Sequence, residues 1–112
     1  MKTIFEKIID GELPSEKVYE DDTIFAIKDK YPKAPVHLLI FPRKAVPDLQ
    51  SLQPEDLLLI PEIVRVAQIL AKQFGVEKEG YRLLVNNGTN AGQTIDHLHF
   101  HLLGGRPLGP MA

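Results

Sequence analysis

Three of the four histidines in this 112-residue chain lie within five positions of one another, in the run TIDHLHFHLLGG. Side chains of a β-strand alternate between its two faces, so His97, His99 and His101 should share one face. The apolar residues between them should point to the other face and into the core. An imidazole is a base, a nucleophile and a metal ligand near neutral pH. We therefore expect the histidine face to look onto a surface or a cleft.

Three interpretations of this cluster are open from the residues alone. The histidines could form the polar face of an amphipathic strand. They could bind zinc, because two imidazoles two positions apart on a strand can share one metal ion, with His37 as a further ligand. They could also carry nucleophilic or acid–base catalysis, in which a neutral histidine is oriented through its second ring nitrogen.

The loop before the cluster favours catalysis on a phosphate. Its sequence, VNNGTNAGQT, offers backbone N–H groups, side-chain amides and hydroxyls. Such donors suit an anion. The chain contains no G-x-x-x-x-G-K-[ST] motif, so this segment is not the phosphate loop of P-loop proteins. The sequence thus predicts a local phosphate site beside the histidines.

The composition limits the other possibilities. A length of 112 residues fits a single domain, and a net charge of -2 predicts no general attraction to nucleic acid or to an anionic membrane. The absence of cysteine excludes disulfides, thiolate zinc sites and a cysteine nucleophile. The first residues, MKTIFEKIIDGELPSEK, carry charges every few positions, so they predict neither a signal peptide nor a membrane span. A cytoplasmic location is therefore expected.

The remaining patterns predict the elements that position these residues. Residues 4–9 have one apolar helical face, and Gly11 follows as a stop. The run KVYEDDTIFAIKD predicts a hairpin, PVHLLIFP a buried strand and YRLLVNNG a strand that enters a turn. TIDHLHFHLLGG is expected to be the last strand, with an irregular tail over 103–112. This order predicts an α+β fold with a five-stranded, mostly antiparallel sheet, one short helix and one long helix.

The long helix is expected over 54–74. Pro54 suits its first turn and Gly75 its end. Its apolar residues extend well beyond one face, so a partner subunit would naturally cover the excess. Pro61 should kink the helix near its start, because proline removes one intrahelical hydrogen bond.

The triad and the segments around it resemble those of a known family. HLHFHLL matches the motif His-φ-His-φ-His-φ-φ, in which φ is apolar, and AGQT precedes it while GGR follows it. IFEKIIDGELPSEKVYEDD and APVHLLIFPRK extend the likeness to nearly the whole chain. It is similar to the histidine triad (HIT) family, in particular to its Hint branch of nucleoside phosphoramidases. The resemblance implies a single HIT domain over 1–112 and a homodimer with one continuous sheet and the long helices at its interface.

The resemblance also implies an activity and roles for the histidines. The activity is hydrolysis of purine nucleoside phosphoramidates or aminoacyl adenylates at the α-phosphorus, through a covalent nucleotidyl-histidine. His99 would be the nucleophile, with its other ring nitrogen held by a backbone carbonyl of the same segment. His101 would contact the phosphate and the bridging position. His97 and His37 would be the outer pair of a hydrogen-bonded relay behind the nucleophile.

The substrate contacts follow from the same likeness. Asn86 and the loop residues Gly92, Gln93 and Thr94 would bind the phosphate and the leaving group, and Asp29 would bind the ribose hydroxyls. Apolar walls for the purine are expected from Ile8, Phe25 and Ile27. No metal and no cofactor is implied.

Relatives with other activities remain alternatives. A dinucleoside polyphosphate hydrolase carries the same triad, but its glutamine-rich loop before the triad is not seen here. A nucleotidylyl transferase would have glutamine in place of His101. A nucleotide-binding interaction module and a metal-binding module are the alternatives without an enzymatic role. Thr94 stands in place of a commoner serine. One departure concerns the preferred leaving group: the tail PLGPMA lacks an aromatic residue.

Overall fold

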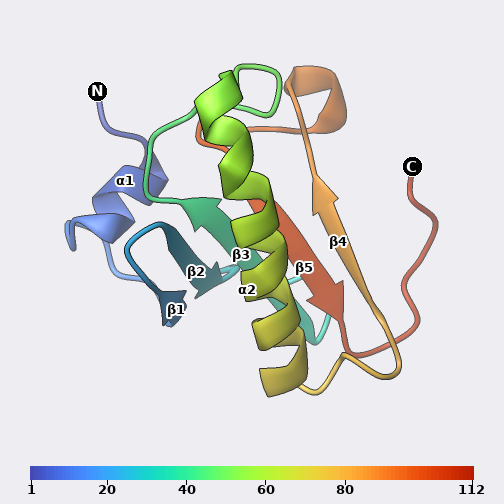
Figure 1. Cartoon of the computed structure of the whole chain (residues 1–112). Helices are drawn as coiled ribbons and strands as arrows, with labels where there is room; N and C mark the ends of the chain where they lie inside the picture. The colour runs from blue at the N-terminus through green and yellow to red at the C-terminus, as the bar shows by residue number, and fades with distance from the viewer.

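The computed structural model describes residues 1–112 and has the predicted α+β architecture (Figure 1). Five strands form one sheet in the order β1-β2-β3-β5-β4, and every neighbouring pair is antiparallel. The elements in chain order are helix α1 (Ile4–Ile9), strands β1 (Lys17–Glu20), β2 (Ile24–Lys28) and β3 (Val36–Pro42), the 3-10 helix η1 (Pro54–Leu58), helix α2 (Leu59–Gln73), strand β4 (Tyr81–Val85), the 3-10 helix η2 (Thr89–Ala91) and strand β5 (Phe100–Gly104).

The two faces of the sheet are covered differently. Helix α2 lies across one face, where its buried residues pack on alternate residues of β2, β3 and β5 and form the main core (Figure 1). On the other face, α1 contributes Phe5 to a smaller cluster with Phe25, Ile27, Leu39 and Phe41. This second cluster covers only the part of the face near β2 and the end of β3. The remainder of that face is therefore available to a functional site.

The short helix α1 forms as predicted and is fixed at both ends. The Thr3 hydroxyl accepts a hydrogen bond from the Glu6 N–H, and the Glu6 carboxylate accepts one from the Thr3 N–H. This reciprocal capping box satisfies two N–H groups that have no partner within the helix. Gly11 has a φ of 80°, which suits the turn that leaves the helix. The buried Phe5 ring anchors α1 on the sheet, stacked 4.4 Å from Phe41 between ring centroids.

The long helix was predicted as one kinked element, but it consists of two segments. Residues Pro54–Leu58 are 3-10 helix, and the α-helix begins at Leu59. Pro61 therefore lies in the first turn of α2, where its missing N–H has no partner to lose. No helix of the protein is both long enough and apolar enough to span a membrane.

The last strand is shorter than predicted. Strand β5 begins at Phe100, so His97 and His99 precede it. The backbone leaves the ladder there because the Leu98 N–H donates to the Val46 carbonyl oxygen, 2.7 Å away, in the loop after β3. Leu103 and Gly104 belong to β5, so the irregular tail starts after Gly104 rather than at 103.

Candidate functional site

The four histidines form a row on the face of the sheet that α1 partly covers. The expected alternation is confirmed, since Leu98, Phe100 and Leu102 are buried in the core beneath α2. His101 pairs with Leu39 across β5 and β3, and His37 pairs with Leu103. Two strands that are distant in the sequence thus bring His37 beside the triad.

The expected exposure of the histidine face is wrong for His97, which is 0% exposed. Its ring lies edge-on to Phe5 and Phe41 under α1. The Nε2–H donates to the Pro42 carbonyl oxygen at 2.8 Å, and Nδ1 accepts from the Thr3 hydroxyl at 3.1 Å. Both ring nitrogens of His97 are therefore hydrogen-bonded within the protein, and neither is free to contact a ligand.

His99 is held in one tautomer. Its Nδ1–H donates to the His97 carbonyl oxygen at 2.7 Å, which is the backbone contact expected for this residue. A carbonyl can only accept, so the proton lies on Nδ1 and Nε2 carries a lone pair. The protein has no buried side-chain nitrogen or oxygen without a hydrogen-bond partner. Because Nε2 of His99 makes no hydrogen bond, it must keep some contact with solvent, although the residue is only 8% exposed.

His37 and His101 have a tautomeric state that is set by the main chain. The Lys33 N–H donates to Nδ1 of His37 at 3.0 Å, so the proton of neutral His37 must lie on Nε2. That proton points to Nδ1 of His101, 3.0 Å away. His101 therefore carries its own proton on Nε2. The neighbouring rings of His99 and His101, 5.2 Å apart between centroids, thus present opposite groups: a lone pair and an N–H.

All four imidazoles are neutral near pH 7. Burial lowers the pKa of His37, His97 and His99 below the usual 6.5, because the charged form loses water. For His101, burial is again the largest cause, and the neighbouring His99 and His37 add to it. Together they lower its pKa to about 4. A neutral His99 is the form that could attack an electrophile.

The expected relay with His97 and His37 as its outer pair is only partly present. His37 is hydrogen-bonded to His101, but no side-chain hydrogen bond joins His101 to His99. His97 holds His99 through its backbone carbonyl, while its ring faces α1. The row therefore consists of two separate units, His37 with His101 and His97 with His99.

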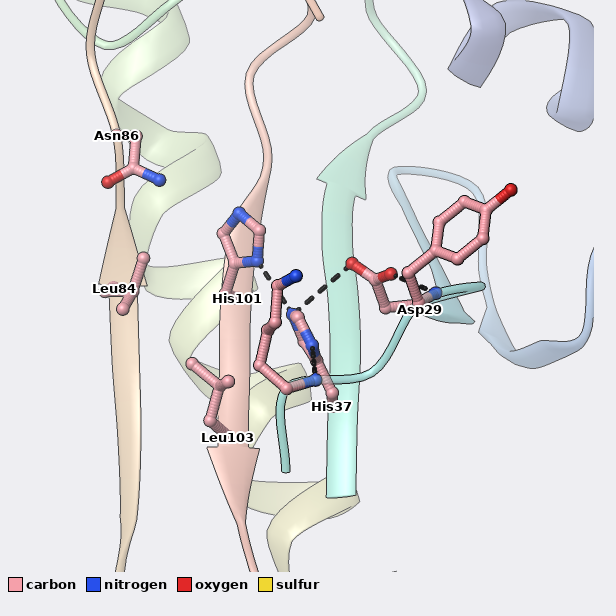
Figure 2. Close-up of a pocket in the computed structure, with 8 residues that line it drawn as sticks. Asp29, His37, Leu84, Asn86, His101 and Leu103 are labelled. Atoms are coloured by element: carbon pink, nitrogen blue, oxygen red, sulfur yellow. Dashed lines mark hydrogen bonds and ion pairs between the residues drawn. The ribbon is translucent and has the colours of Figure 1, made fainter. Parts of the chain in front are cut away.

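A pocket of about 350 Å³ lies beside His101 on the open part of this face (Figure 2). Of the predicted site residues, the structure brings Asp29, His37, Asn86 and His101 together in its lining. The other lining residues are Tyr31, Lys33, Leu84 and Leu103. Figure 2 shows Asn86 at the end of β4 and Asp29 after β2, on opposite sides of His101. The pocket therefore combines a carboxylate, an amide and imidazoles, and strands β3, β5 and β4 form its floor.

The loop before the triad is held by internal hydrogen bonds, which use the donors that the prediction assigned to a substrate at Gln93 and Gly92. Gln93 is buried, and its amide donates to the carbonyl oxygens of Pro47 and Ile95 while its Oε1 accepts from the Gly88 N–H. Its own N–H donates to the Gly88 carbonyl oxygen. Gln93 thus braces the loop and has no donor left for a substrate. The Gly92 N–H is likewise used, by the Thr89 carbonyl oxygen.

Thr94 differs from its neighbours. It is exposed, and neither its N–H nor its hydroxyl makes a hydrogen bond within the protein. No hydrogen bond joins residues 92–94 to any histidine ring. Thr94 is therefore the member of the predicted loop that keeps two donors for an anion.

The predicted apolar walls for a purine lie away from the pocket. Phe25 and Ile27 are almost fully buried in the cluster under α1, and Ile8 packs against this cluster. Neither they nor Ile8 line the pocket beside His101. Contacts within the core cover most of the surface of these three side chains. Only the rim of the cluster is therefore available to a purine base.

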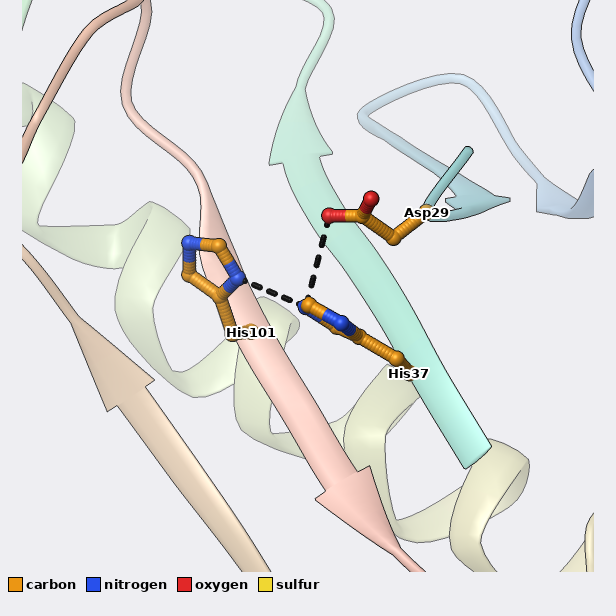
Figure 3. Close-up of side chains that lie close together, drawn as sticks. All are labelled: Asp29, His37 and His101. Carbon is orange, nitrogen blue, oxygen red and sulfur yellow. Dashed lines mark hydrogen bonds and ion pairs between the residues drawn. The ribbon is translucent and has the colours of Figure 1, made fainter. Parts of the chain in front are cut away.

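Asp29, His37 and His101 form the one group that could hold a metal ion (Figure 3). Each offers one ligand atom, and these atoms lie within 4.8 Å of one another. However, the Nε2 of His37 carries a proton, because the Lys33 N–H occupies Nδ1. A protonated nitrogen cannot coordinate a metal. The hydrogen bonds therefore favour a proton-sharing trio over a metal centre, and the ligand set proposed from the sequence, with His97 or His99 beside His37, does not assemble.

Two residues that organise the site were missed by the sequence analysis. Thr3 holds both α1 and His97, and the pattern T-x-x-E at residues 3–6 is a readable signal of the helix cap. Lys33 sets the tautomer of His37 through its N–H. No pattern in the sequence marks a residue that acts only through its main chain.

Comparisons with known proteins identify the family of this chain. A family model described as HIT domain matches residues 10–108. The purine nucleoside phosphoramidase of Escherichia coli K12 is 44% identical over 110 residues, which are 98% of this chain and 92% of that protein. An uncharacterised HIT-like protein of Chlamydia trachomatis is 52% identical over 112 residues, the full length of both. The HIT family hydrolase from Clostridium thermocellum has a TM-score of 0.94 at 43% identity, covering 98% of this chain and 96% of that one.

Proposed function

The chain belongs to the histidine triad (HIT) family, and on this basis we propose that it is a hydrolase of purine nucleoside phosphoramidates or aminoacyl adenylates. It would cleave at the α-phosphorus through a covalent nucleotidyl-histidine and release a nucleoside monophosphate. The observation that carries the proposal is the pair of opposite tautomers at His99 and His101. One ring offers a lone pair to phosphorus, while its neighbour offers an N–H to the group that leaves.

In the first step, the Nε2 lone pair of His99 attacks phosphorus and the bond from phosphorus to the leaving group breaks. The backbone carbonyl of His97 holds the Nδ1 proton and stabilises the positive charge that develops on the ring. Phe5, whose ring centroid lies 4.9 Å from that of His99, keeps the imidazole in place. Division of one substitution into two is the advantage of such a covalent intermediate.

The departing amine needs one proton, which we assign to His101. The pKa of His101 is about 4 in the free protein, but a bound phosphoryl anion favours the imidazolium and raises it. The Nε2 of His101 then protonates the amine and afterwards accepts a proton from the water that attacks the nucleotidyl-histidine. While His101 is charged, its Nδ1–H displaces His37, whose Nε2–H can turn to Asp29, 3.4 Å away.

Donors around the phosphate stabilise its charge. Asn86 lines the pocket and its amide makes no hydrogen bond within the protein, and Thr94 keeps a hydroxyl and an N–H free. Gly92, with a φ of 92°, turns the backbone toward Thr94, and Gln93 fixes the loop from within. Such preorganised donors need no rearrangement as charge develops.

We assign the contacts with the nucleoside to Asp29 and to the apolar cluster under α1. Asp29 keeps one carboxylate oxygen near His37 and would use it for the ribose hydroxyls, because the Tyr31 N–H already occupies the other oxygen. The base would lie on the rim of the cluster under α1, near Ile8 with Phe25 and Ile27 behind it. No metal or cofactor takes part in this scheme.

Mass spectrometry of the trapped intermediate tests the proposal. Brief reaction with an adenosine phosphoramidate should add the mass of one nucleoside monophosphate to the protein, on His99. The variant His99→Ala should lose both the adduct and turnover by at least about 10³-fold, because the nucleophile is absent. An unchanged rate in this variant would exclude the mechanism. Parallel assays with dinucleoside polyphosphates and aminoacyl adenylates decide between the related activities.

We also propose that the protein is a cytoplasmic homodimer. The absence of cysteine is consistent with a reducing compartment. Strand β4 is an unpaired edge of the sheet (Figure 1), and α2 and the turn before it leave large apolar side chains exposed. Pairing of two such edges, with the helices in contact, would cover both features.

A further inference from the structure

The segment that sets the tautomer of His37 is tied to the rest of the protein by a single hydrogen bond. Residues 29–35 connect β2 to β3. Within this loop, the Tyr31 N–H donates to Asp29 Oδ1 and the Lys33 N–H donates to His37 Nδ1, at 2.8 Å and 3.0 Å. Both bonds stay within residues 29–37. The one bond from elsewhere comes from Arg106, whose Nη2 donates to the Lys33 carbonyl oxygen at 2.8 Å.

Lys33 is therefore held on both of its backbone groups. Arg106 fixes its carbonyl, while its N–H rests on His37. A hydrogen bond from a charged guanidinium to a carbonyl is stronger than one between neutral groups. The loop also packs through the buried Ala34, but no other hydrogen bond from outside residues 29–37 holds the backbone of Lys33. The position of Arg106 is thus coupled to the side of the ring on which His37 carries its proton.

The backbone before Arg106 is built for this contact. Gly104 pairs with Val36 at the start of β3, so the tail leaves β5 beside the loop. Gly105 has a φ of 98°, and a Cβ at this position would lie 2.9 Å from the Cβ of Pro35. Only glycine adopts this conformation at such close approach. The left-handed turn therefore directs Arg106 onto the loop.

We propose that Arg106 is a positioning residue for acid–base chemistry at His101. By holding the Lys33 carbonyl, it keeps the Lys33 N–H on Nδ1 of His37, so that the proton of His37 stays on Nε2 and faces His101. The effect on turnover rests on the proposed function, since it requires His101 to act on the leaving group. The effect on the tautomer of His37 is independent of the proposed function.

The first experiment measures the tautomer directly. Two-bond ¹H–¹⁵N correlation spectra of the imidazoles distinguish a protonated ring nitrogen from a bare one. In the wild type, His37 should carry its proton on Nε2. In Arg106→Ala it should become a mixture of both tautomers, and Arg106→Lys, which keeps one cationic donor, should restore most of the wild-type signal. Arg82→Ala is the matched control, because Arg82 donates to the Gly109 carbonyl oxygen of the same tail at 3.0 Å but does not touch the loop.

The second experiment measures turnover of an adenosine phosphoramidate in the same proteins, after light scattering has shown equal assembly. A His37 with a bare Nε2 would draw the proton of neutral His101 onto Nδ1 and so remove the N–H that His101 offers to the leaving group. We therefore expect kcat to fall about tenfold in Arg106→Ala, with KM within about twofold, and to stay at the wild-type value in Arg82→Ala. In a His37→Gln background, Arg106→Ala should cost nothing further, because two residues that act through one contact are not additive.

The outcomes distinguish the positioning role of Arg106 from the proposed hydrolase function. An unchanged His37 tautomer in Arg106→Ala would overturn the inference, and so would an undiminished loss in the His37→Gln background. A changed tautomer in a protein whose wild type cleaves no phosphoramidate would support the positioning role of Arg106 and reject the proposed function.

Discussion

Main-chain groups set the tautomers of His99 and His37 in the candidate site, and His37 in turn sets that of His101. The carbonyl of His97 takes the Nδ1 proton of His99, and the N–H of Lys33 forces the proton of His37 toward His101. Two rings of the same type, 5.2 Å apart, therefore present a lone pair and a donor. An ordinary imidazole exchanges between its two tautomers, so in the proposed mechanism this fixed arrangement would divide the roles of His99 and His101.

If His101 protonates the leaving group, its loss should depend on what leaves. The variant His101→Ala should slow cleavage of an adenosine phosphoramidate by about 10² to 10⁴-fold, because an amine leaves poorly without a proton. Cleavage of the p-nitrophenyl ester of the same nucleotide should fall by less than about tenfold, since nitrophenolate leaves as an anion. Steady-state rates with the two substrates provide the comparison.

The variant His99→Ala is the control for this comparison, because loss of the nucleophile should abolish cleavage of both substrates. Equal losses for the amine and the nitrophenyl ester in His101→Ala would show instead that His101 stabilises charge on the phosphate.

At the level of elements, the strand pattern predicted correctly which residues point into the core, but it did not predict that His97 is buried beneath another element. Alternation placed Leu98, Phe100 and Leu102 in the core because local backbone geometry alone decides it. The burial of His97 depends on α1, which covers it from the other end of the chain through a Thr3 contact 94 residues away in the sequence. Such long-range packing leaves no local pattern in the sequence.

The candidate site was predictable as a set of residue types and less so as an arrangement. Asp29, His37, Asn86 and His101 do line one pocket. In contrast, Gln93 turned inward, because three backbone groups of its own loop and of the loop after β3 need its amide. A polar residue in a loop can hydrogen-bond to the loop itself or to a ligand, and the amino-acid composition of the loop does not distinguish these two cases.

Helix α1 offers a test of how an element supports the site. The variant Thr3→Ala removes the helix cap and the hydroxyl that donates a hydrogen bond to His97. It should therefore lower the free energy of unfolding by about 1–2 kcal/mol. Urea unfolding monitored by circular dichroism gives this value. Thr3→Ser keeps the hydroxyl and should stay within about 0.5 kcal/mol of the wild type. An equal loss in both variants would attribute the effect to the methyl group instead of the hydrogen bonds.

For the whole molecule, the unequal cover of the sheet explains where function can lie. Helix α2 covers the central strands on one face, while α1 closes only the end of the other face near Phe41. The site occupies the remaining open area, where His101 and the pocket lie. This arrangement leaves β4, whose Leu84 and Asn86 border the pocket, as a free sheet edge. An unprotected edge of this kind favours pairing with another chain.

The same edge and the outer surface of α2 lead to a prediction about assembly. Four apolar side chains of α2 and of η1 before it are far from buried. Leu57 and Leu58 in η1 are 56% and 74% exposed, and Val64 and Ile69 in α2 are 40% and 41% exposed. If two copies cover this surface in a dimer, Leu58→Glu should weaken association by at least about a hundredfold, because burial of an unpaired carboxylate costs several kcal/mol. Leu13→Glu, at an apolar residue that is 38% exposed in the turn after α1, is the matched control and should not change association. Light scattering over a dilution series should give twice the chain mass for the wild type and the control, and the mass of one chain for Leu58→Glu. A wild-type mass equal to one chain throughout the series would contradict the dimer.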